Sequence, residues 1–325
     1  MKTIKNHDQQ YLEKLVNIDF QPVFILGLHR SGTSILYKML TATGCFNPVT
    51  AYHLIRYNQL LYDHENKREE SSKKELTRSF KEKGLEDRGI DRLQVTADFA
   101  EEYGFLLGQK TFQMYINSKN LSLFTELCKK IQFISGNDKS ILLKNPYDFP
   151  NFFYIKKVFP NAKFVFIHRH PFKTLSSTIK AIRFLLKNKN PYTTQLFKTY
   201  NKIFENPLFL HMLRFCFSRF PALGIVLLTN NSSKATKYYL KNIKHISKQD
   251  HIFLTYEDLC KNLQENIEKI MESLGIETYN KIDFTSFIKP RKTQLDPSVR
   301  QLRKVIYKSM KEYFKFFGYK LEEPI

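Results

Sequence analysis

The chain has 325 residues, and 42% of them are apolar, which is enough to bury a substantial core in a single domain spanning 1–325. Lysine and arginine outnumber aspartate and glutamate by 52 to 31, and the formal charge of +21 favours anionic partners. The four scattered cysteines exclude a disulfide scaffold, and the longest apolar runs fall short of a membrane span.

Nucleic acid is the first anionic partner that such a charge suggests. The sequence has no helix-turn-helix, zinc-finger or RNP signature, so we expect no nucleic-acid partner. Neither H-E-x-x-H nor C-x-x-C occurs, and we expect no metal site. Residues 1–21 are polar and lack the apolar region of a signal peptide, which favours a cytoplasmic protein.

The first predicted elements are a buried strand, a glycine-bounded loop and a helix within 22–44. Val23 to Leu26 form the continuous apolar run of a parallel strand buried on both faces. The loop GLHRSGTS has the spacing of a nucleotide P-loop, except that Thr33 occupies the lysine position. Unpaired N–H groups at the helix start predict an anion site. A P-loop kinase or NTPase is one class of protein that would have such a site.

Two more strands are predicted within 140–180, where SILLKNPYDFP is followed by KFVFIHRHPFKTLSSTIK. The first strand ends at Lys144, and the second ends at Arg169, with Ser177 eight residues later on a helix. A strand, a helix and a strand in this order predict a right-handed βαβ unit. Arg169 offers a planar fork that matches phosphate oxygens, whereas Lys144 taken alone is also typical of a lysine that extends to solvent.

The other segments carry weaker signals. The highly charged stretch 67–91 predicts a solvated helix or loop. Helices of the insertion 182–250 are expected to cover the acceptor side, and its part 204–228 mixes aromatic and basic residues, as in a helix at a membrane surface or a domain interior. A strand followed by a turn at 251–259, a helix at 263–274 and a helix from about 299 to 317 complete the chain.

Arg30 to Ser34, R-S-G-T-S, resembles the 5′-phosphosulfate loop of the PAPS-dependent sulfotransferases, and Arg169 with Ser177 resembles the family's 3′-phosphate motif. The K-N-P step at Lys144 resembles the branch that includes the tyrosylprotein enzymes and many bacterial members. The resemblance implies a three-layer α/β fold with a central, mainly parallel sheet of four or five strands, helices on both faces and a helical acceptor-side region. It covers 22–44, 140–180 and 251–317.

The same resemblance implies site residues. Lys144 would stabilise charge at the transferred sulfuryl group, and Arg30 would act both there and in binding. PAPS would be the co-substrate, with no metal, and the implied binding residues are Arg30, Ser31, Gly32, Thr33, Ser34, Arg169 and Ser177. A basic loop at Arg291 and Lys292 would cover the 3′-phosphate, although a solvated basic turn fits that sequence equally well.

The sequence leaves the identity of the general base open between two main candidates. The tyrosylprotein branch has a glutamate about 20 residues beyond the loop arginine, where this chain has TAYH, so His53 is one candidate. The segment 88–105 loosely resembles a different bacterial branch, which makes Glu102 the second candidate, with Glu101 behind it.

The expected activity is transfer of a sulfuryl group to a hydroxyl of a sugar, glycolipid or small metabolite. Two alternatives remain at this stage: a kinase-like or NTPase-like enzyme, and a non-catalytic module that binds anions or a membrane surface. Peripheral membrane contact through about 204–228 is compatible with each of them.

Overall fold

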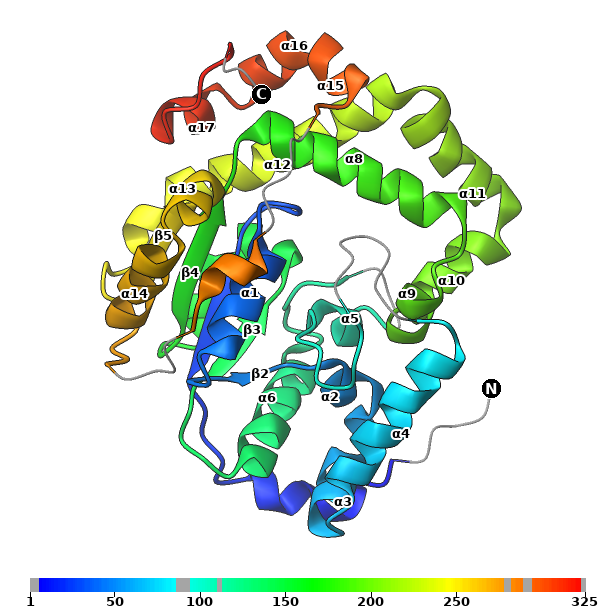
Figure 1. Cartoon of the computed structure of the whole chain (residues 1–325), viewed down its shortest axis with the longest axis vertical. Helices are drawn as coiled ribbons and strands as arrows, with labels where there is room; N and C mark the ends of the chain where they lie inside the picture. Colours follow the sequence, from blue (N-terminus) through cyan, green and yellow to red (C-terminus); the bar gives the residue numbers. More distant parts are fainter. Residues whose placement is uncertain (1–5, 86–93, 110–112, 278–281, 289–293, 323–325) are drawn as a thin grey trace.

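A five-stranded sheet forms the centre of the protein, with the order β2-β3-β1-β4-β5 and every pairing parallel (Figure 1). The strands are β1 (Pro22–Leu26), β2 (Asn47–Pro48), β3 (Ile141–Lys144), β4 (Lys163–His168) and β5 (His251–Thr255). This computed structural model describes residues 6–85, 94–109, 113–277, 282–288 and 294–322. The predicted α/β fold with a mainly parallel sheet is confirmed.

Helices cover both faces of this sheet. Those of the first half of the chain are α1 (Thr33–Ala42), α2 (Ala51–Ile55), α3 (Leu60–Glu65), α4 (Glu69–Glu82), α5 (Gly104–Leu107), α6 (Leu121–Ser135) and α7 (Phe152–Val158). Those of the second half are α8 (Pro171–Lys187), α9 (Pro191–Leu196), α10 (Lys198–Glu205), α11 (Pro207–Arg214), α12 (Pro221–Asn242), α13 (Tyr256–Lys261), α14 (Leu263–Ser273), α15 (Pro297–Gln301), α16 (Arg303–Ser309) and α17 (Lys311–Phe316).

The central strand β1 shows why its sequence is apolar at every position. Val23 and Ile25 pack with helices α1 and α14, whereas Phe24 and Leu26 pack with α6, α7 and α12 on the opposite face. Side chains alternate between the two faces of a strand, so a strand that is covered on both sides needs no polar residue. Three layers result, and the carboxyl ends of β1, β3 and β4 share one edge.

The segment 182–250 contributes to the core as well as to the periphery. Helix α12 buries Tyr239 in the same core cluster as Phe149 of the turn after β3 and Phe166 of β4, and the three rings contact one another. Of the two expectations for the apolar residues of this segment, a membrane surface and a domain interior, the interior holds for Tyr239 of α12. Likewise α4, within the charged stretch 67–91, is anchored by buried Leu76 and Phe80.

The carboxyl-terminal part differs from the single helix expected over about 299–317. The structure has three short helices instead, α15 to α17, which pack with α8 and α12 in a separate cluster. The helices are separated by breaks at Leu302 and Met310, and the segment lies beside α8 and α12 (Figure 1). Among the described residues, no single helix combines the length and apolar character needed to cross a membrane.

Candidate active site

The loop between β1 and α1 needs both of its glycines. A Cβ on Gly27 would lie 2.3 Å from the carbonyl oxygen of Ile167 on β4, so the loop and β4 could not approach as they do. Gly32 has φ 109°, and a Cβ there would lie 2.4 Å from the ring of Tyr256. Arg30 also has a positive φ, 67°, which is costly for a residue with a side chain. The tight turn before α1 therefore includes a strained backbone conformation at Arg30.

The turn brings Arg30 into contact with the two residues predicted to bind the 3′-phosphate. The Nε of Arg30 donates to the Oγ of Ser177 on α8 over 3.1 Å, and the Nη1 of Arg169 donates to the carbonyl oxygen of Arg30 over 3.0 Å. The loop, the end of β4 and helix α8 therefore meet in one place. Residues that are 139 and 147 positions apart in the chain form one cationic cluster.

Two polar atoms in this cluster have unused hydrogen-bonding capacity. Among the described residues, the Oγ of Ser31 and the Nε of Arg169 are buried without a hydrogen-bond partner. Buried polar groups are almost always paired, so such atoms indicate a ligand that completes their bonding. The guanidinium of Arg169 is held in place by the ring of Tyr256, whose centroid is 4.2 Å away. The cluster therefore fits an anionic ligand with oxygen acceptors.

Lys144 lies beside the loop, at the end of β3. Its Nζ is 2.7 Å from the Oε1 of Glu102 and donates to the Oγ of Ser34 over 3.0 Å. The lysine side chain is fully buried, and the glutamate is 12% exposed. A cation that does not reach solvent needs its partners nearby, so this lysine is not one that extends to water. The ammonium of Lys144, the carboxylate of Glu102 and the loop residue Ser34 therefore lie together at the carboxyl end of β3.

A buried polar network fixes the relative position of these groups. Asp148, three residues after Asn145, accepts from the Tyr103 hydroxyl (2.7 Å), from the Asn145 side-chain amide (2.8 Å) and from the backbone N–H of Ile116 (2.9 Å). Burial raises the pKa of Asp148, and these donors partly offset the rise. Tyr103 follows Glu102 and Asn145 follows Lys144, so the network joins the two segments that present the catalytic candidates.

His29 and Tyr147 belong to the same site, and the sequence analysis did not assign them a role. Their rings meet edge to face with centroids 4.5 Å apart. Burial lowers the pKa of His29, and the nearby charges of Glu102 and Lys144 act on it with opposite signs. The lowered pKa means that the imidazole of His29 is neutral. The sequence signal that could have identified them is position, because His29 lies inside the loop motif and Tyr147 directly follows the K-N-P step.

His53, the other predicted base, has a different position. Thr50 and His53 form a capping box at the start of α2, in which the His53 Nδ1 accepts from the Thr50 N–H over 3.1 Å. Burial and the charge of Lys73 lower the pKa of His53 to about 3, so the ring is a poor proton acceptor near neutral pH. These contacts argue against His53 as the base.

Substitutions of His53 separate a role in capping helix α2 from a role as the general base. His53→Gln is expected to keep turnover and stability close to those of the wild type, because glutamine is a regular partner in a capping box. His53→Ala should cost about 1–3 kcal/mol of stability by leaving the Thr50 N–H without its acceptor, again with kcat unchanged for the folded enzyme. Loss of kcat in the glutamine variant would reinstate His53 as the base.

Glu101 is also held by structural contacts. Its Oε1 accepts from the backbone N–H of Glu102 and its Oε2 accepts from the Tyr192 hydroxyl of α9, both over 2.8 Å, and the side chain is buried. Glu102 is thus the carboxylate that faces the lysine. Arg291 and Lys292 lie outside the described residues. Among the described residues, no group of three histidines, cysteines or carboxylates could hold a metal ion.

Comparisons with known proteins find matches to the sequence and to the fold of this chain. Residues 22–187 match the sequence model described as the Sulfotransferase family, a stretch that contains the loop, Lys144 and Arg169. The fold is similar to that of the sulfotransferase STF9 from Mycobacterium avium, with TM-score 0.68, 14% identity, and coverage of 97% of this chain and 81% of that chain. It is also similar to the sulfotransferase STF1 from Mycobacterium tuberculosis H37Rv, with TM-score 0.55, 14% identity, and coverage of 97% and 78%. No curated protein matches the sequence.

Proposed function

The chain belongs to the sulfotransferase family, and we propose that it moves a sulfuryl group from PAPS to the hydroxyl of a carbohydrate, glycolipid or small metabolite. The observation that carries this proposal is the meeting of Lys144, Glu102 and Ser34 at the end of β3, next to the anion loop. A base, a cation and helix-start donors are the groups that such a transfer requires.

In the proposed complex, the two ends of the donor occupy two parts of one cluster. The helix-start N–H groups and the side chains of Ser31, Thr33 and Ser34 bind the 5′-phosphosulfate. Arg169 and Ser177 bind the 3′-phosphate, with Arg30 between the two ends, since it contacts both residues. The free Oγ of Ser31 and Nε of Arg169 support this assignment, because both would gain acceptors.

The reaction forms a bond between the acceptor oxygen and sulfur, and it breaks the bond between sulfur and the oxygen of the 5′-phosphate. Glu102 accepts the proton of the acceptor hydroxyl. Lys144 and Arg30 stabilise the negative charge that grows on the bridging and terminal oxygens, and adenosine 3′,5′-bisphosphate leaves. The contact between Lys144 and Glu102 keeps the base in place before the acceptor arrives.

A thermal-shift titration tests the donor. Adenosine 3′,5′-bisphosphate should stabilise the folded protein without magnesium, by about 2.7 kcal/mol at one hundred times its Kd. ATP and ADP, each with and without magnesium, are the comparison ligands. A larger shift with ATP and magnesium than with the bisphosphate would favour a kinase-like enzyme instead. Binding of the bisphosphate without turnover of PAPS on any hydroxyl acceptor would indicate a non-catalytic module.

A further inference from the structure

Helix α11 and the π-helical turn that follows it, Phe215–Arg219, are apolar in sequence and yet have no buried residue. Leu208 is 85% exposed, and Met212 and Phe215 follow it at helical spacing, both exposed. An apolar stripe normally faces a core. Here it faces outward over the whole length of the segment.

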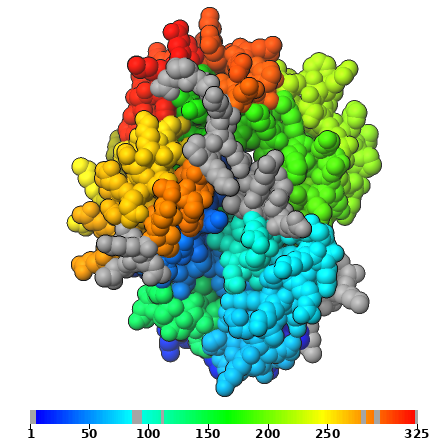
Figure 2. Space-filling model, viewed as in Figure 1, coloured from blue at the N-terminus to red at the C-terminus, as the bar shows by residue number. Residues whose placement is uncertain are grey.

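The start of α12 extends the same surface. The ring of Phe220 contacts that of Phe215 in a tilted arrangement with centroids 4.5 Å apart, and the exposed large apolar residues of this arm are Phe220, Leu223, Val226 and Leu227. Gly224 lets α12 pack closely against the π-helical turn, because a Cβ there would lie 2.6 Å from the ring of Phe217. We call residues 207–227 the apolar hairpin, which forms the upper right edge of the molecule in Figures 1 and 2.

The stretch of sequence that contains this hairpin carries most of the net positive charge of the chain. Residues 149–249 contain 18 lysines and arginines and one carboxylate, Glu205, so this third of the chain carries +17 of the formal charge of +21. The remaining 224 residues are nearly balanced. Arg214 and Arg219 lie within the hairpin, and Arg183 and Lys187 lie at its base, so these cations favour an anionic surface over a second copy of the same face.

Some of these cations surround a cavity of about 340 Å³ at the base of the hairpin, lined by Arg183, Lys187, Arg214 and Ser218. Arg183 pairs with Asp296 and donates to the Phe217 carbonyl, and Arg214 donates to the carbonyl oxygens of Leu186 and Lys187. These contacts fix the two guanidinium groups, while the lining as a whole keeps a net positive charge. The charge of this open pocket suits a phosphate group, and its volume is large enough to admit one.

We propose that the apolar hairpin docks onto the surface of an anionic lipid membrane, with its apolar residues in the interfacial region and lipid phosphates at the cavity of Arg183, Lys187 and Arg214. Exposed aromatic and aliphatic residues flanked by cations are the features of helices that lie at such a surface. The proposal goes beyond sulfuryl transfer and does not depend on it.

The hairpin lies on the membrane and does not cross it. The bent pair Pro207–Arg219 and Pro221–His245, with an angle of 93°, is long and apolar enough by composition to be considered for a span. However, α12 buries Thr229, Ser233, Ala235 and Tyr239 against the rest of the protein. Withdrawing this half of α12 for a span would remove Tyr239 from the core, so only the exposed arms are available to lipid.

Vesicle co-sedimentation of the full chain, without PAPS, tests the proposal. Vesicles of phosphatidylcholine with phosphatidylglycerol should bind the protein, vesicles of phosphatidylcholine alone should bind it much less, and salt should weaken the binding. The double variant Leu208→Ser, Leu223→Ser should reduce binding roughly ten-fold or more, because it removes two apolar anchors. Lys187→Glu should reduce binding to the anionic vesicles by roughly ten-fold as well.

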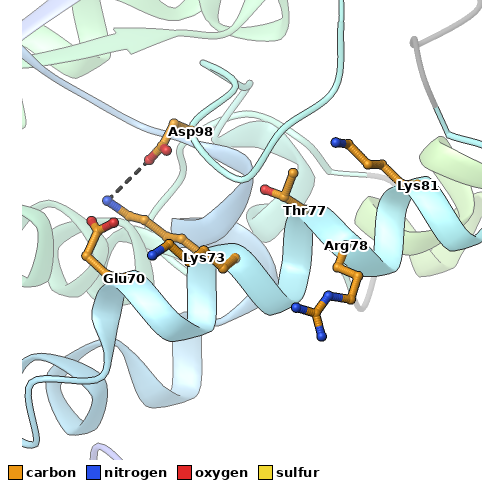
Figure 3. A pocket seen from close by; sticks show the side chains of 7 residues that line it. Glu70, Lys73, Thr77, Arg78, Lys81 and Asp98 are labelled. Atoms are coloured by element: carbon orange, nitrogen blue, oxygen red, sulfur yellow. Dashed lines mark ion pairs between the residues drawn. The ribbon is translucent and has the colours of Figure 1, made fainter.

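Matched control variants come from other faces of the molecule. Phe316→Ser removes a ring that is 52% exposed on α17, and it should leave vesicle binding unchanged. Lys81→Glu reverses a charge on α4, where a cationic groove also contains Glu70 and Asp98 and where Lys73 pairs with Asp98 over 3.2 Å (Figure 3). Helix α4, which the structure describes in full, has no exposed large apolar residue, so this groove should not contribute to lipid binding.

Three results would overturn the proposal. Absence of binding to the anionic vesicles is the first, and equal losses in the control and hairpin variants are the second. The third is a dimer in light scattering that Leu208→Ser, Leu223→Ser disrupts, because the hairpin would then be covered by a second copy. Melting temperatures equal to that of the wild type should accompany every variant, which keeps lost binding separate from lost folding.

Discussion

Lys144→Met is expected to lower kcat by about 10²–10³-fold while the Kd of adenosine 3′,5′-bisphosphate changes little. The reason is that the Lys144 ammonium lies beside Glu102 and Ser34, where charge would develop in the transition state, and not among the groups assigned to the 3′-phosphate. Single-turnover rates with saturating PAPS, measured together with titration of the bisphosphate, separate the two effects.

The chain supplies a matched control for this substitution. Lys130 on α6 is also fully buried and is paired with Asp8 over 2.9 Å and Glu126 over 2.8 Å. Removing one partner of a buried pair costs about 3–5 kcal/mol of stability, so Lys130→Met and Lys144→Met should both lower the melting temperature. Only the change at Lys144 should lower kcat of the folded enzyme. Equal rate losses in both variants would mean that Lys144 acts through stability alone.

Glu102→Gln completes the same experiment. An amide keeps the shape of the side chain and can no longer accept the proton of the acceptor hydroxyl, so kcat should fall by about 10²–10⁴-fold. Binding of the bisphosphate should persist. A variant that retains full kcat would remove Glu102 from the mechanism.

Arg169→Ala is expected to weaken binding of adenosine 3′,5′-bisphosphate by about 1.5–3 kcal/mol, which is roughly 10-fold to 150-fold in Kd. The Arg169 guanidinium is held by Tyr256 and by the Arg30 carbonyl with its Nε left for a ligand. Arg169→Lys should recover only part of the loss, because an ammonium cannot reproduce the planar fork.

Adenosine 5′-monophosphate provides the internal control for Arg169. This ligand lacks the 3′-phosphate, so its affinity should be the same for the wild type and for Arg169→Ala. Isothermal titration of both ligands with both proteins gives a thermodynamic double cycle. The coupling free energy from this cycle measures the interaction between Arg169 and the 3′-phosphate. If Arg169→Ala weakens both ligands equally, Arg169 does not recognise that group.

Residues in the loop and at the strand ends were the part of the site that sequence could predict. A buried strand, a turn and a helix are local patterns, so Arg30, Ser34, Lys144 and Arg169 could be located from spacing and resemblance. Their mutual contacts follow from a parallel sheet, whose strands present their carboxyl ends at one edge.

The general base could not be chosen from sequence for a physical reason. Glu101 and Glu102 are neighbours, and what separates them is a hydroxyl from Tyr192, 91 residues away in the chain. The same limit applies to His53, whose place in the capping box became evident only when its Nδ1 was seen to accept from Thr50. The burial of α12 depended likewise on long-range packing of Tyr239.

Helix α8 connects the donor cluster with the apolar hairpin. Ser177, in contact with Arg30, and Lys187, at the cavity of the hairpin, are ten residues apart on this one helix, a rise of about 15 Å. A docked enzyme would therefore keep its donor cluster and its lipid contact on one continuous helix, about three turns apart.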